Sequence, residues 1–200
     1  GKTTCFYIMV GLIKPDDGKV NIGKIDITGY PVYERARIGL GYLPQEMSIF
    51  KGLSVEDNLL SIIETKEFDN HKRYQILEDL LVEFNITKIR SSLGITLSGG
   101  ERRRVEIARC IASNPTHILL DEPFSGIDPI AIQDLKNLIG YLKQRKIGIL
   151  ITDHNVKDTL DIVDRAYVLY DGKILLKGNP FEIKNDQKVK SVYLGKSFSI

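Results

Sequence analysis

Short apolar runs alternate along this chain with longer segments in which apolar residues recur every three or four positions. The first pattern is typical of buried strands and the second of helices with one buried face. Clusters of glycine, proline and aspartate mark the turns between them. In the first part of the chain these patterns predict a helix at Thr3–Val10 that ends at Gly11, a turn at Pro15–Gly18, a strand pair at Val20–Ile27 and a strand at Ile38–Leu43.

The pattern changes between about residues 53 and 96, where only helical spacing is found. Ser54 and the three residues that follow it are typical of a capping box at the start of a helix. The segment Lys72–Phe84 places Ile76, Leu77, Leu80, Leu81 and Phe84 on one helical face. Because strand-like runs flank this stretch, we expect residues 53–96 to form a helical subdomain inserted into a sheet-bearing core.

Strand-like runs resume after this stretch, and the last two are separated by Asp171-Gly172, a strong hairpin signal. The tail from Asn179 predicts further helix, with Val189, Val192 and Leu194 as its apolar contacts. Strands that alternate with helices favour an α/β fold in which helices cover a mixed or parallel sheet, here as one domain of residues 1–200. We expect the central sheet to resume at His117–Asp121, Ile147–Thr152 and Arg165–Tyr170, and a hairpin strand to follow at Lys173–Lys177.

Composition narrows the class of protein. A hydrophobic content of 42% with 27% charged residues is that of a globular chain, which excludes a disordered one. The formal net charge of +2 gives no electrostatic reason to expect nucleic acid or an anionic membrane surface as a partner. No apolar run approaches the ~18 residues of a membrane span, so we expect any link to a membrane to run through a partner.

Gly1-Lys2-Thr3-Thr4 stand at the start of the first predicted helix and match the second half of a phosphate-binding P-loop. Free N–H groups at a helix N-terminus favour phosphate, and the Lys2 ammonium can pair with the β- and γ-phosphate oxygens. The Thr3 hydroxyl can bind Mg²⁺. The fragment alone is weak support, because G-K-T occurs by chance in many chains.

The run His117-Ile118-Leu119-Leu120 ends in two acids, Asp121 and Glu122, followed by a proline. A buried strand of this kind delivers carboxylates at its carboxyl end, where ligands bind in open α/β sheets. Asp121 is then placed to hold a Mg²⁺ shell, and Glu122 to orient or deprotonate an attacking water. The alternative is an exposed strand end with solvated acids.

Leu97-Ser98-Gly99-Gly100-Glu101 is the most specific signal in the chain. Two glycines after a serine cap allow backbone N–H groups to approach an anion at the start of a helix. The alternative is a capping box of Ser98 and Glu101 that only begins a helix. Each glycine in the first turn lowers helix propensity by about 1 kcal/mol, which favours the anion-binding interpretation.

With L-S-G-G-E about twenty residues before I-L-L-D-E-P, the chain resembles the ABC ATPase family over essentially its whole length. Gln45, after the strand that ends Leu43-Pro44, matches the family's Q-loop. Ser125–Asp128 matches its D-loop. His154, after the strand that ends at Thr152, matches its switch histidine, although a lone histidine at a strand end is usually only a satisfied polar group.

The resemblance implies ATP and Mg²⁺ as ligands and ATP hydrolysis as the activity. It implies Glu122, His154 and Gln45 as catalytic residues, and Thr3, Gln45 and Asp121 as metal ligands. It further implies a homodimer, in which Ser98 and Gly100 complete the nucleotide site of a second copy. The nucleotide-binding residues so implied are Gly1, Lys2, Thr3, Thr4, Ser98, Gly99, Gly100 and Asp128.

The resemblance also implies integral membrane transporter subunits as partners, bound through the region Gln45–Phe50, and no nucleic acid. We therefore expect a cytoplasmic protein that is peripheral on the inner face of the cytoplasmic membrane. Ile49 and Phe50 are large apolar residues in this loop and are candidates for an interaction patch. The alternative is that Phe50 packs into the core of the helical insert.

Within the family, four segments resemble the group of lipopolysaccharide-export ATPases, and branched-chain amino-acid importers are a close alternative. A soluble ABC protein acting on nucleic acid is less expected, because such chains usually add long coiled coils or a second ATPase copy. The four segments are Gly41–Glu46 with Ser48–Phe50, Arg102–Glu106, Ile151–Val156 and the terminal Val192–Gly195.

The sequence departs from the family's G-x-x-x-x-G-K-[ST] loop, because only the last glycine and the residues after it are present. The family's first strand and the aromatic residue on which adenine stacks are also missing here. We therefore expect residues ahead of Gly1 in the natural protein, and weak phosphate binding by a chain that has only half of the loop.

Overall fold

The computed structural model describes residues 1–191, so the terminal segment Val192–Gly195 and the predicted contact Leu194 lie outside the described residues. Within this part of the chain, no helix is both long enough and apolar enough to cross a membrane. The elements in chain order are α1 (Lys2–Val10), β1 (Asn21–Ile22), β2 (Ile25–Asp26), α2 (Val32–Arg37), β3 (Leu40–Leu43), α3 (Val55–Ile63), α4 (Asn70–Glu83), the 3₁₀-helices η1 (Thr87–Ile89) and η2 (Gly94–Thr96), α5 (Gly99–Ala112), β4 (His117–Asp121), α6 (Pro129–Gln144), β5 (Gly148–Thr152), α7 (Val156–Leu160), β6 (Ala166–Tyr170), β7 (Lys173–Gly178), α8 (Pro180–Asn185) and α9 (Gln187–Val189).

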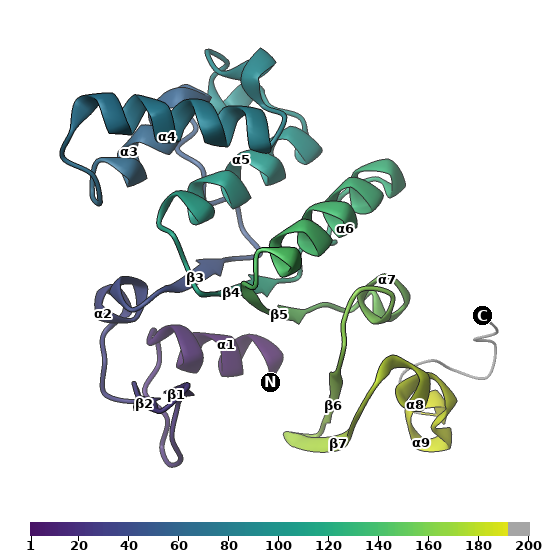
Figure 1. Ribbon diagram of the computed structural model, residues 1–200. Helices are drawn as coiled ribbons and strands as arrows, with labels where there is room; N and C mark the ends of the chain where they lie inside the picture. The colour runs from purple at the N-terminus through teal and green to yellow at the C-terminus, as the bar shows by residue number, and fades with distance from the viewer. Residues whose placement is uncertain (192–200) are drawn as a thin grey trace.

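A parallel sheet with the order β3-β4-β5 forms the centre of the fold, as the strand pattern predicts (Figure 1). Successive side chains of β4 point alternately into two hydrophobic cores, one on each face of the sheet. Ile118 and Leu120 pack with the helices α3, α4, α5 and α6, and Leu119 packs with Phe6 and Val10 of α1. Successive side chains of a strand point to opposite faces, so one short apolar run supplies both cores. Figure 1 shows α1 on one side of this sheet and α5 and α6 on the other.

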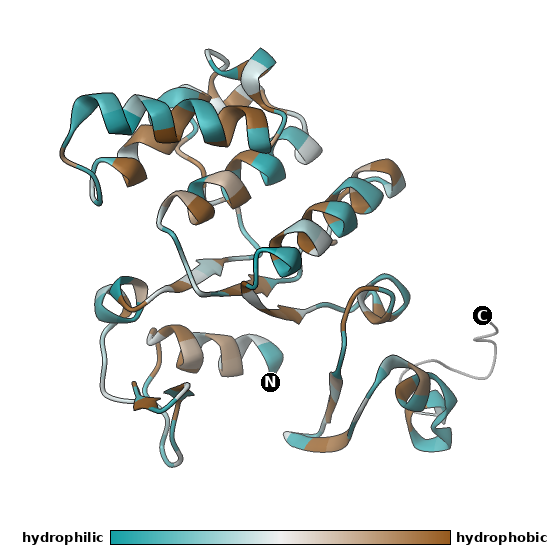
Figure 2. Ribbon diagram, viewed as in Figure 1, coloured by the Kyte–Doolittle hydropathy of each residue, from teal (hydrophilic) through white to brown (hydrophobic). Residues whose placement is uncertain are grey.

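The helices α3 and α4 pack mainly on each other and on α5 (Figure 1). Ser54 caps α3 by accepting a hydrogen bond from the Asp57 N–H, and Asp69 caps α4 in the same way through Lys72. Figure 2 shows α4 hydrophilic on its outer side and hydrophobic toward α3 and α5. The buried residues on that side include Leu77 and Leu81. The predicted helical spacing is therefore observed, and its apolar face belongs to the same core as Leu120.

The prediction that the strand at Arg165–Tyr170 continues the central sheet is wrong. Among the described residues, β6 pairs only with β7, in a separate antiparallel sheet joined through the turn at Asp171-Gly172. The physical reason is that this hairpin has a core of its own. Val168 and Leu176 pack with Leu160, Ile183 and Val189, from the helices α7, α8 and α9.

Arg35 is a buried arginine, 2% exposed, whose hydrogen-bond partners are all backbone carbonyls. Its guanidinium donates to Ile8 and Met9 near the end of α1, at 2.7 Å each, and to Thr28 and Tyr30 at 2.9 and 2.8 Å. The carbonyls at a helix C-terminus are unsatisfied within the helix and carry partial negative charge. Arg35 therefore fixes the C-terminal end of α1 against α2.

We predict that Arg35→Met destabilises the protein by about 3 kcal/mol, because the loss leaves several buried carbonyl groups without a donor. Urea unfolding followed by circular dichroism measures the change. Arg37→Met is the matched control on the same helix: Arg37 is exposed, and its replacement should change stability by less than about 0.5 kcal/mol. Equal effects of the two variants would contradict this role of Arg35.

Candidate functional site

Three predicted catalytic residues meet at the carboxyl ends of the central strands. Gln45 follows β3, Glu122 follows β4 and His154 follows β5. One carboxylate oxygen of Glu122 accepts a hydrogen bond from Gln45 Nε2 at 2.8 Å and lies 3.3 Å from His154 Nδ1. Carboxyl ends of parallel strands share one edge of a sheet, which brings these residues together from distant parts of the chain. The imidazole remains largely exposed, at 65% of its side-chain surface.

Asp121 lies beside this group but is buried, at 2% exposure. Its carboxylate accepts a hydrogen bond from the Thr152 hydroxyl at 2.5 Å, and the Tyr42 hydroxyl donates to the other oxygen at a longer 3.5 Å. Burial, with the neighbouring negative charge of Asp121 as a second cause, raises the pKa of Tyr42 to about 12. Tyr42 therefore remains a neutral donor to Asp121 across the physiological pH range.

The N-terminus of α1 faces the same edge of the sheet. Lys2 Nζ donates a hydrogen bond to the backbone carbonyl of Asp153, the residue before His154, at 2.9 Å. No side chain caps α1, and no acidic residue lies in its first turn. Thr3 and Thr4 are exposed there. The first N–H groups of this helix are therefore available to an anion.

The oxygen ligands near this helix fit a magnesium ion that is held together with a phosphate. Of the predicted metal ligands, Asp121 would supply a carboxylate, Thr3 a hydroxyl and Gln45 an amide oxygen. In residues 1–191, no three acidic, histidine or cysteine side chains gather as a protein-only metal cage. Magnesium is commonly held by one or two carboxylates plus substrate phosphates, which is the type of donor set found here.

The remaining predicted nucleotide-binding residues form a second group at the starts of α5 and α6. Ser98 and Glu101 make a reciprocal capping box, and the hydrogen bonds from Ser98 lower the pKa of Glu101. Asp128 caps α6 by accepting from the N–H groups of Ile130 and Ala131. A Cβ atom on Gly100 would lie 3.4 Å from that of Ala131, so the two helix starts are close together.

No hydrogen bond or ion pair joins this second group to Lys2, Glu122 or His154 within the described chain. The capping box of Ser98 and Glu101, which the sequence analysis gave as the alternative interpretation, is present.

The two large apolar residues in the loop after Gln45, Ile49 and Phe50, differ in their exposure to solvent. Phe50 is 51% exposed and lies under the Arg109 guanidinium, 4.9 Å from the ring centroid, whereas Ile49 is 5% exposed. The prediction that Ile49 belongs to an interaction patch is therefore wrong, because its side chain fills the core beneath the loop. Phe50 does not pack into that core, contrary to the alternative.

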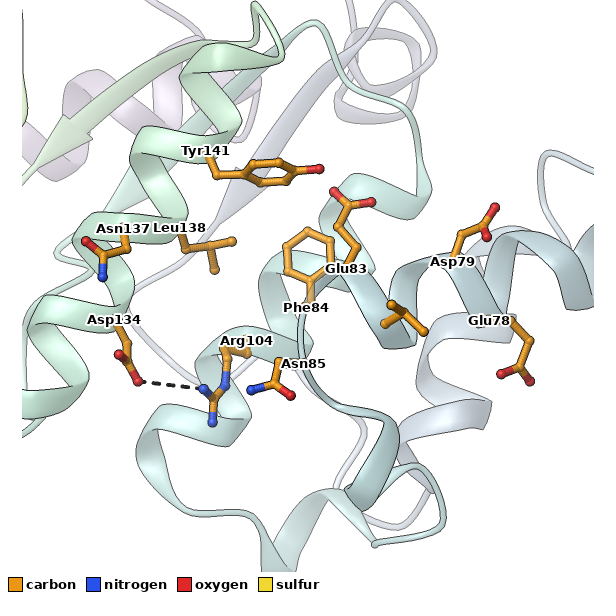
Figure 3. A pocket seen from close by; sticks show the side chains of 11 residues that line it. Glu78, Asp79, Glu83, Phe84, Asn85, Arg104, Asp134, Asn137, Leu138 and Tyr141 are labelled. Atoms are coloured by element: carbon orange, nitrogen blue, oxygen red, sulfur yellow. Dashed lines mark ion pairs between the residues drawn. The ribbon is translucent and has the colours of Figure 1, made fainter.

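A hollow of about 710 Å³ lies elsewhere, between α4, α5 and α6 (Figure 3). Phe84, Leu138 and Tyr141 form part of its wall, and an ion pair between Arg104 and Asp134 crosses one end at 3.6 Å. None of its lining residues is a predicted site residue. We therefore place the candidate site at the strand ends, where the predicted residues meet, and not at this larger hollow.

Sequence reasoning assigned no role to Tyr42, Thr152 or Asp153. Tyr42 and Thr152 contact the Asp121 carboxylate, and Asp153 accepts from Lys2. All three lie at or beside the ends of strands that the pattern located correctly. Their position next to Gln45 and His154 in the sequence is the signal that could have identified them.

An open helix N-terminus with a lysine, beside carboxylates at the ends of parallel strands, is the arrangement of a phosphate-binding α/β protein. The chain matches the profile of the family described as ABC transporter over residues 1–125. It is 54% identical over 200 residues to the lipopolysaccharide export system ATP-binding protein LptB of Acidithiobacillus ferridurans, covering 100% of this chain and 83% of the relative. The protein of the same name from Escherichia coli is 49% identical over 201 residues, with the same coverage.

Among solved structures, MJ1267, an ATP-binding cassette of an ABC transporter, superposes with a TM-score of 0.84 at 28% identity and covers 98% of this chain and 84% of its own. The chain therefore belongs to the ABC transporter family and is an ATP-binding subunit with the activity of an ABC transporter ATPase. The family resemblance found in the sequence is thereby confirmed.

Proposed function

We propose that this subunit hydrolyses ATP with Mg²⁺ as one half of a homodimer, and that the hydrolysis drives lipopolysaccharide export through integral membrane subunits. The observation that carries the catalytic part is the contact of Gln45 and His154 with one oxygen of Glu122. A carboxylate with an amide on one side and an imidazole on the other can orient a water molecule and accept its proton.

The proposed roles follow from the positions of the side chains. Lys2 and the N–H groups at the start of α1 bind the phosphates, Glu122 accepts the proton of the attacking water, and His154 and Gln45 orient that water. Asp121 and Thr3 hold the metal ion, with Gln45 as a further ligand. Mg²⁺, when bound, neutralises charge on the phosphate oxygens.

We predict that Glu122→Gln lowers kcat by about 100-fold or more, because the amide keeps the shape of the side chain but cannot accept a proton. ATP binding should be retained. ATP turnover and calorimetric ATP affinity are measured on the natural gene product at full length. Turnover close to that of the unmodified protein would refute the assignment of Glu122 as the base.

The dimer proposal rests on the separation of the two groups of predicted site residues. Ser98 and Asp128 are exposed, and Ile130 next to them is 79% exposed. An exposed apolar residue often marks a contact surface. Here it lies beside polar groups that can bind an anion, which suits contact with the nucleotide site of a second copy. In this arrangement Ser98, Gly99, Gly100 and Asp128 of one copy complete the nucleotide site around Lys2 of the other.

We predict that mixing Ser98→Arg chains with Lys2→Ala chains restores ATP hydrolysis that neither variant shows alone. In the mixed dimer both lesions fall on one composite site, so the other site contains only intact residues. Turnover of the mixture is compared with that of each separate variant. Melting temperatures serve as a control, because Ser98→Arg also removes a helix cap worth about 1 kcal/mol. A mixture that remains inactive while both chains are folded would contradict the shared site.

The docking face that we propose for the membrane subunits surrounds Phe50. Leu53, Leu93 and Ile95 are exposed apolar residues of this face. Backbone hydrogen bonds join their segments, from Gly94 N–H to the Leu53 carbonyl and from Ile95 N–H to the Lys51 carbonyl, at 2.9 and 3.0 Å. An aromatic ring in an apolar surround is the kind of anchor that carries binding energy.

A groove of about 290 Å³ lies close to this face, lined in part by Val32, Ser48, Ile62 and Arg109. Arg109 belongs both to this groove and to the contact with the Phe50 ring. We propose that a helix of the membrane subunit seats here, between the α/β core and the helical subdomain of residues 53–96. The chain then works as a peripheral protein on the inner face of the cytoplasmic membrane.

We predict that Phe50→Ala weakens assembly with the membrane subunits about tenfold or more, since truncating an aromatic anchor costs about 2 kcal/mol of binding. Thermal stability and ATP binding should hardly change, because the ring is half-exposed. Copurification with the membrane subunits of a lipopolysaccharide exporter is measured beside thermal melting.

Phe68→Ala is the matched control, because Phe68 is 84% exposed at another place on the surface and should leave assembly intact. A large drop in melting temperature of Phe50→Ala with normal assembly would refute the docking face. The two relatives named above support lipopolysaccharide export as the transport function. Assembly with the membrane subunits of a branched-chain amino-acid importer, and not with those of the exporter, would replace it.

A further inference from the structure

Glu122 has an unusual backbone conformation, with φ at 44° in the left-handed region. Asn85, Asn114, Lys146 and Asp171 also have positive φ. Asparagine and aspartate tolerate this region better than glutamate or lysine does, so Glu122 and Lys146 are the strained positions among the described residues. A residue with a larger side chain is strained there by about 1–2 kcal/mol and remains in place only when its surroundings fix it. The position of the Glu122 carboxylate therefore depends on the contacts that hold this turn.

Three hydrogen bonds hold the turn. The Glu122 N–H donates to the Thr152 carbonyl at 2.7 Å, and the Ser125 N–H donates back to the Glu122 carbonyl at 3.1 Å. The third comes from a side chain, because the Phe124 N–H donates to Asp153 Oδ2 at 3.0 Å. Asp153 thus contacts the turn from the segment that carries His154.

The carboxylate of Asp153 is fully buried, at 0% side-chain exposure. Its second oxygen, Oδ1, accepts from the Asn155 N–H at 2.7 Å and lies 3.8 Å from His154 Nδ1. A buried carboxylate is costly unless its oxygens accept hydrogen bonds, and here each oxygen accepts one backbone N–H. An ionised carboxylate offers acceptors on both sides, whereas an amide of the same shape offers an acceptor on one side only.

We propose that Asp153 is the positioning residue that holds Glu122 opposite His154. This inference rests on the proposed function only in taking Glu122 as the catalytic base. Asp153 bridges the amide of Phe124, two residues after Glu122, and the amide of Asn155, one residue after His154. The bridge fixes the turn in its strained conformation and fixes the 3.3 Å separation of Glu122 and His154 at the same time. Asp153 acts through Glu122 and His154, and its own carboxylate is shielded by the two amides.

The test replaces Asp153 by alanine, which removes both acceptors but retains the backbone carbonyl that accepts from Lys2. Amide hydrogen exchange by NMR is the first readout. Exchange at Phe124 and Asn155 should become about tenfold faster or more, while Leu119 and Leu120 in β4 stay protected, because only a local hydrogen bond is lost. Acceleration at all four amides would mean general destabilisation and would overturn the proposal, as would unchanged exchange at Phe124.

The second readout is steady-state ATP hydrolysis by the full-length gene product. We expect Asp153→Ala to lower kcat by about tenfold or more with little change in KM, because a misplaced base lowers the rate without loss of nucleotide binding. In a Glu122→Gln background the same change should cause no further loss, since Asp153 acts through Glu122. An additional equal loss in that background, or an unchanged kcat in the single variant, would overturn the proposal.

Two further variants complete the design. Asp164→Asn is the matched control, because Asp164 follows His154 in the same part of the chain but is 78% exposed and pairs with Lys143 instead; it should change neither the exchange of Phe124 nor kcat. Asp153→Asn keeps the shape of the side chain and takes the place of alanine if that variant does not fold, with faster exchange expected at one of the two amides. If Glu122→Gln were fully active, the catalytic assignment would fail, whereas the exchange data would still decide whether Asp153 holds the turn.

Discussion

The parallel pairing of β4 with β5 is the interaction on which the rest of the structure depends. Leu120 lies opposite Ile151 and Asp121 opposite Thr152, so the two strands end side by side. The hydrogen bond from the Glu122 N–H to the Thr152 carbonyl extends this pairing one step beyond the strands. Because β4 is buried on both faces, a shift of register would expose its apolar residues. The hydrophobic core therefore fixes the register of β4 and β5, and this register sets the distance between Glu122 and His154.

The loop that carries Gln45 is fixed from a different direction. Glu106 of α5, only 4% exposed, accepts a hydrogen bond from the Ser48 N–H at 2.9 Å and pairs with Arg103 at 3.0 Å. A buried ion pair gains little stability by itself because of the cost of removing two charges from water, but losing either partner is expensive. The pair thus ties the loop to α5 while Gln45 reaches Glu122. Since Phe50 lies in the same short loop as Gln45, the backbone connects the proposed docking face to the residue that donates a hydrogen bond to Glu122.

An ion pair between two helices holds the segment that carries His154 in a similar way. Lys136 of α6 pairs with Asp158 of α7 at 2.7 Å and with Asp161 just beyond it at 3.0 Å. Burial opposes the charge of Lys136, but its hydrogen bonds with the two aspartates outweigh this, and its pKa is raised. The helix that follows Asp128 is therefore joined to the helix that follows His154.

The sequence by itself determined the features that depend on neighbouring residues. Helical and strand periods, the caps at Ser54 and Ser98 and the hairpin turn at Asp171 are local, and the structure has each of them where the pattern predicts it. The order of the motifs likewise sufficed for the family, because residue type and spacing carry the phosphate-binding chemistry. Only the tertiary structure decided that β6 and β7 form a separate sheet, and that Ile49 is buried while Phe50 is exposed.

The tertiary structure alone also placed Asp153 at the site. Its carbonyl accepts from Lys2, which is 151 positions away, and its carboxylate from Phe124, which is 29 away. Contacts of this kind arise when the core sets the register of the sheet and the direction in which each strand ends. No period or motif in the sequence encodes them, because they depend on how separate segments pack and not on any segment alone.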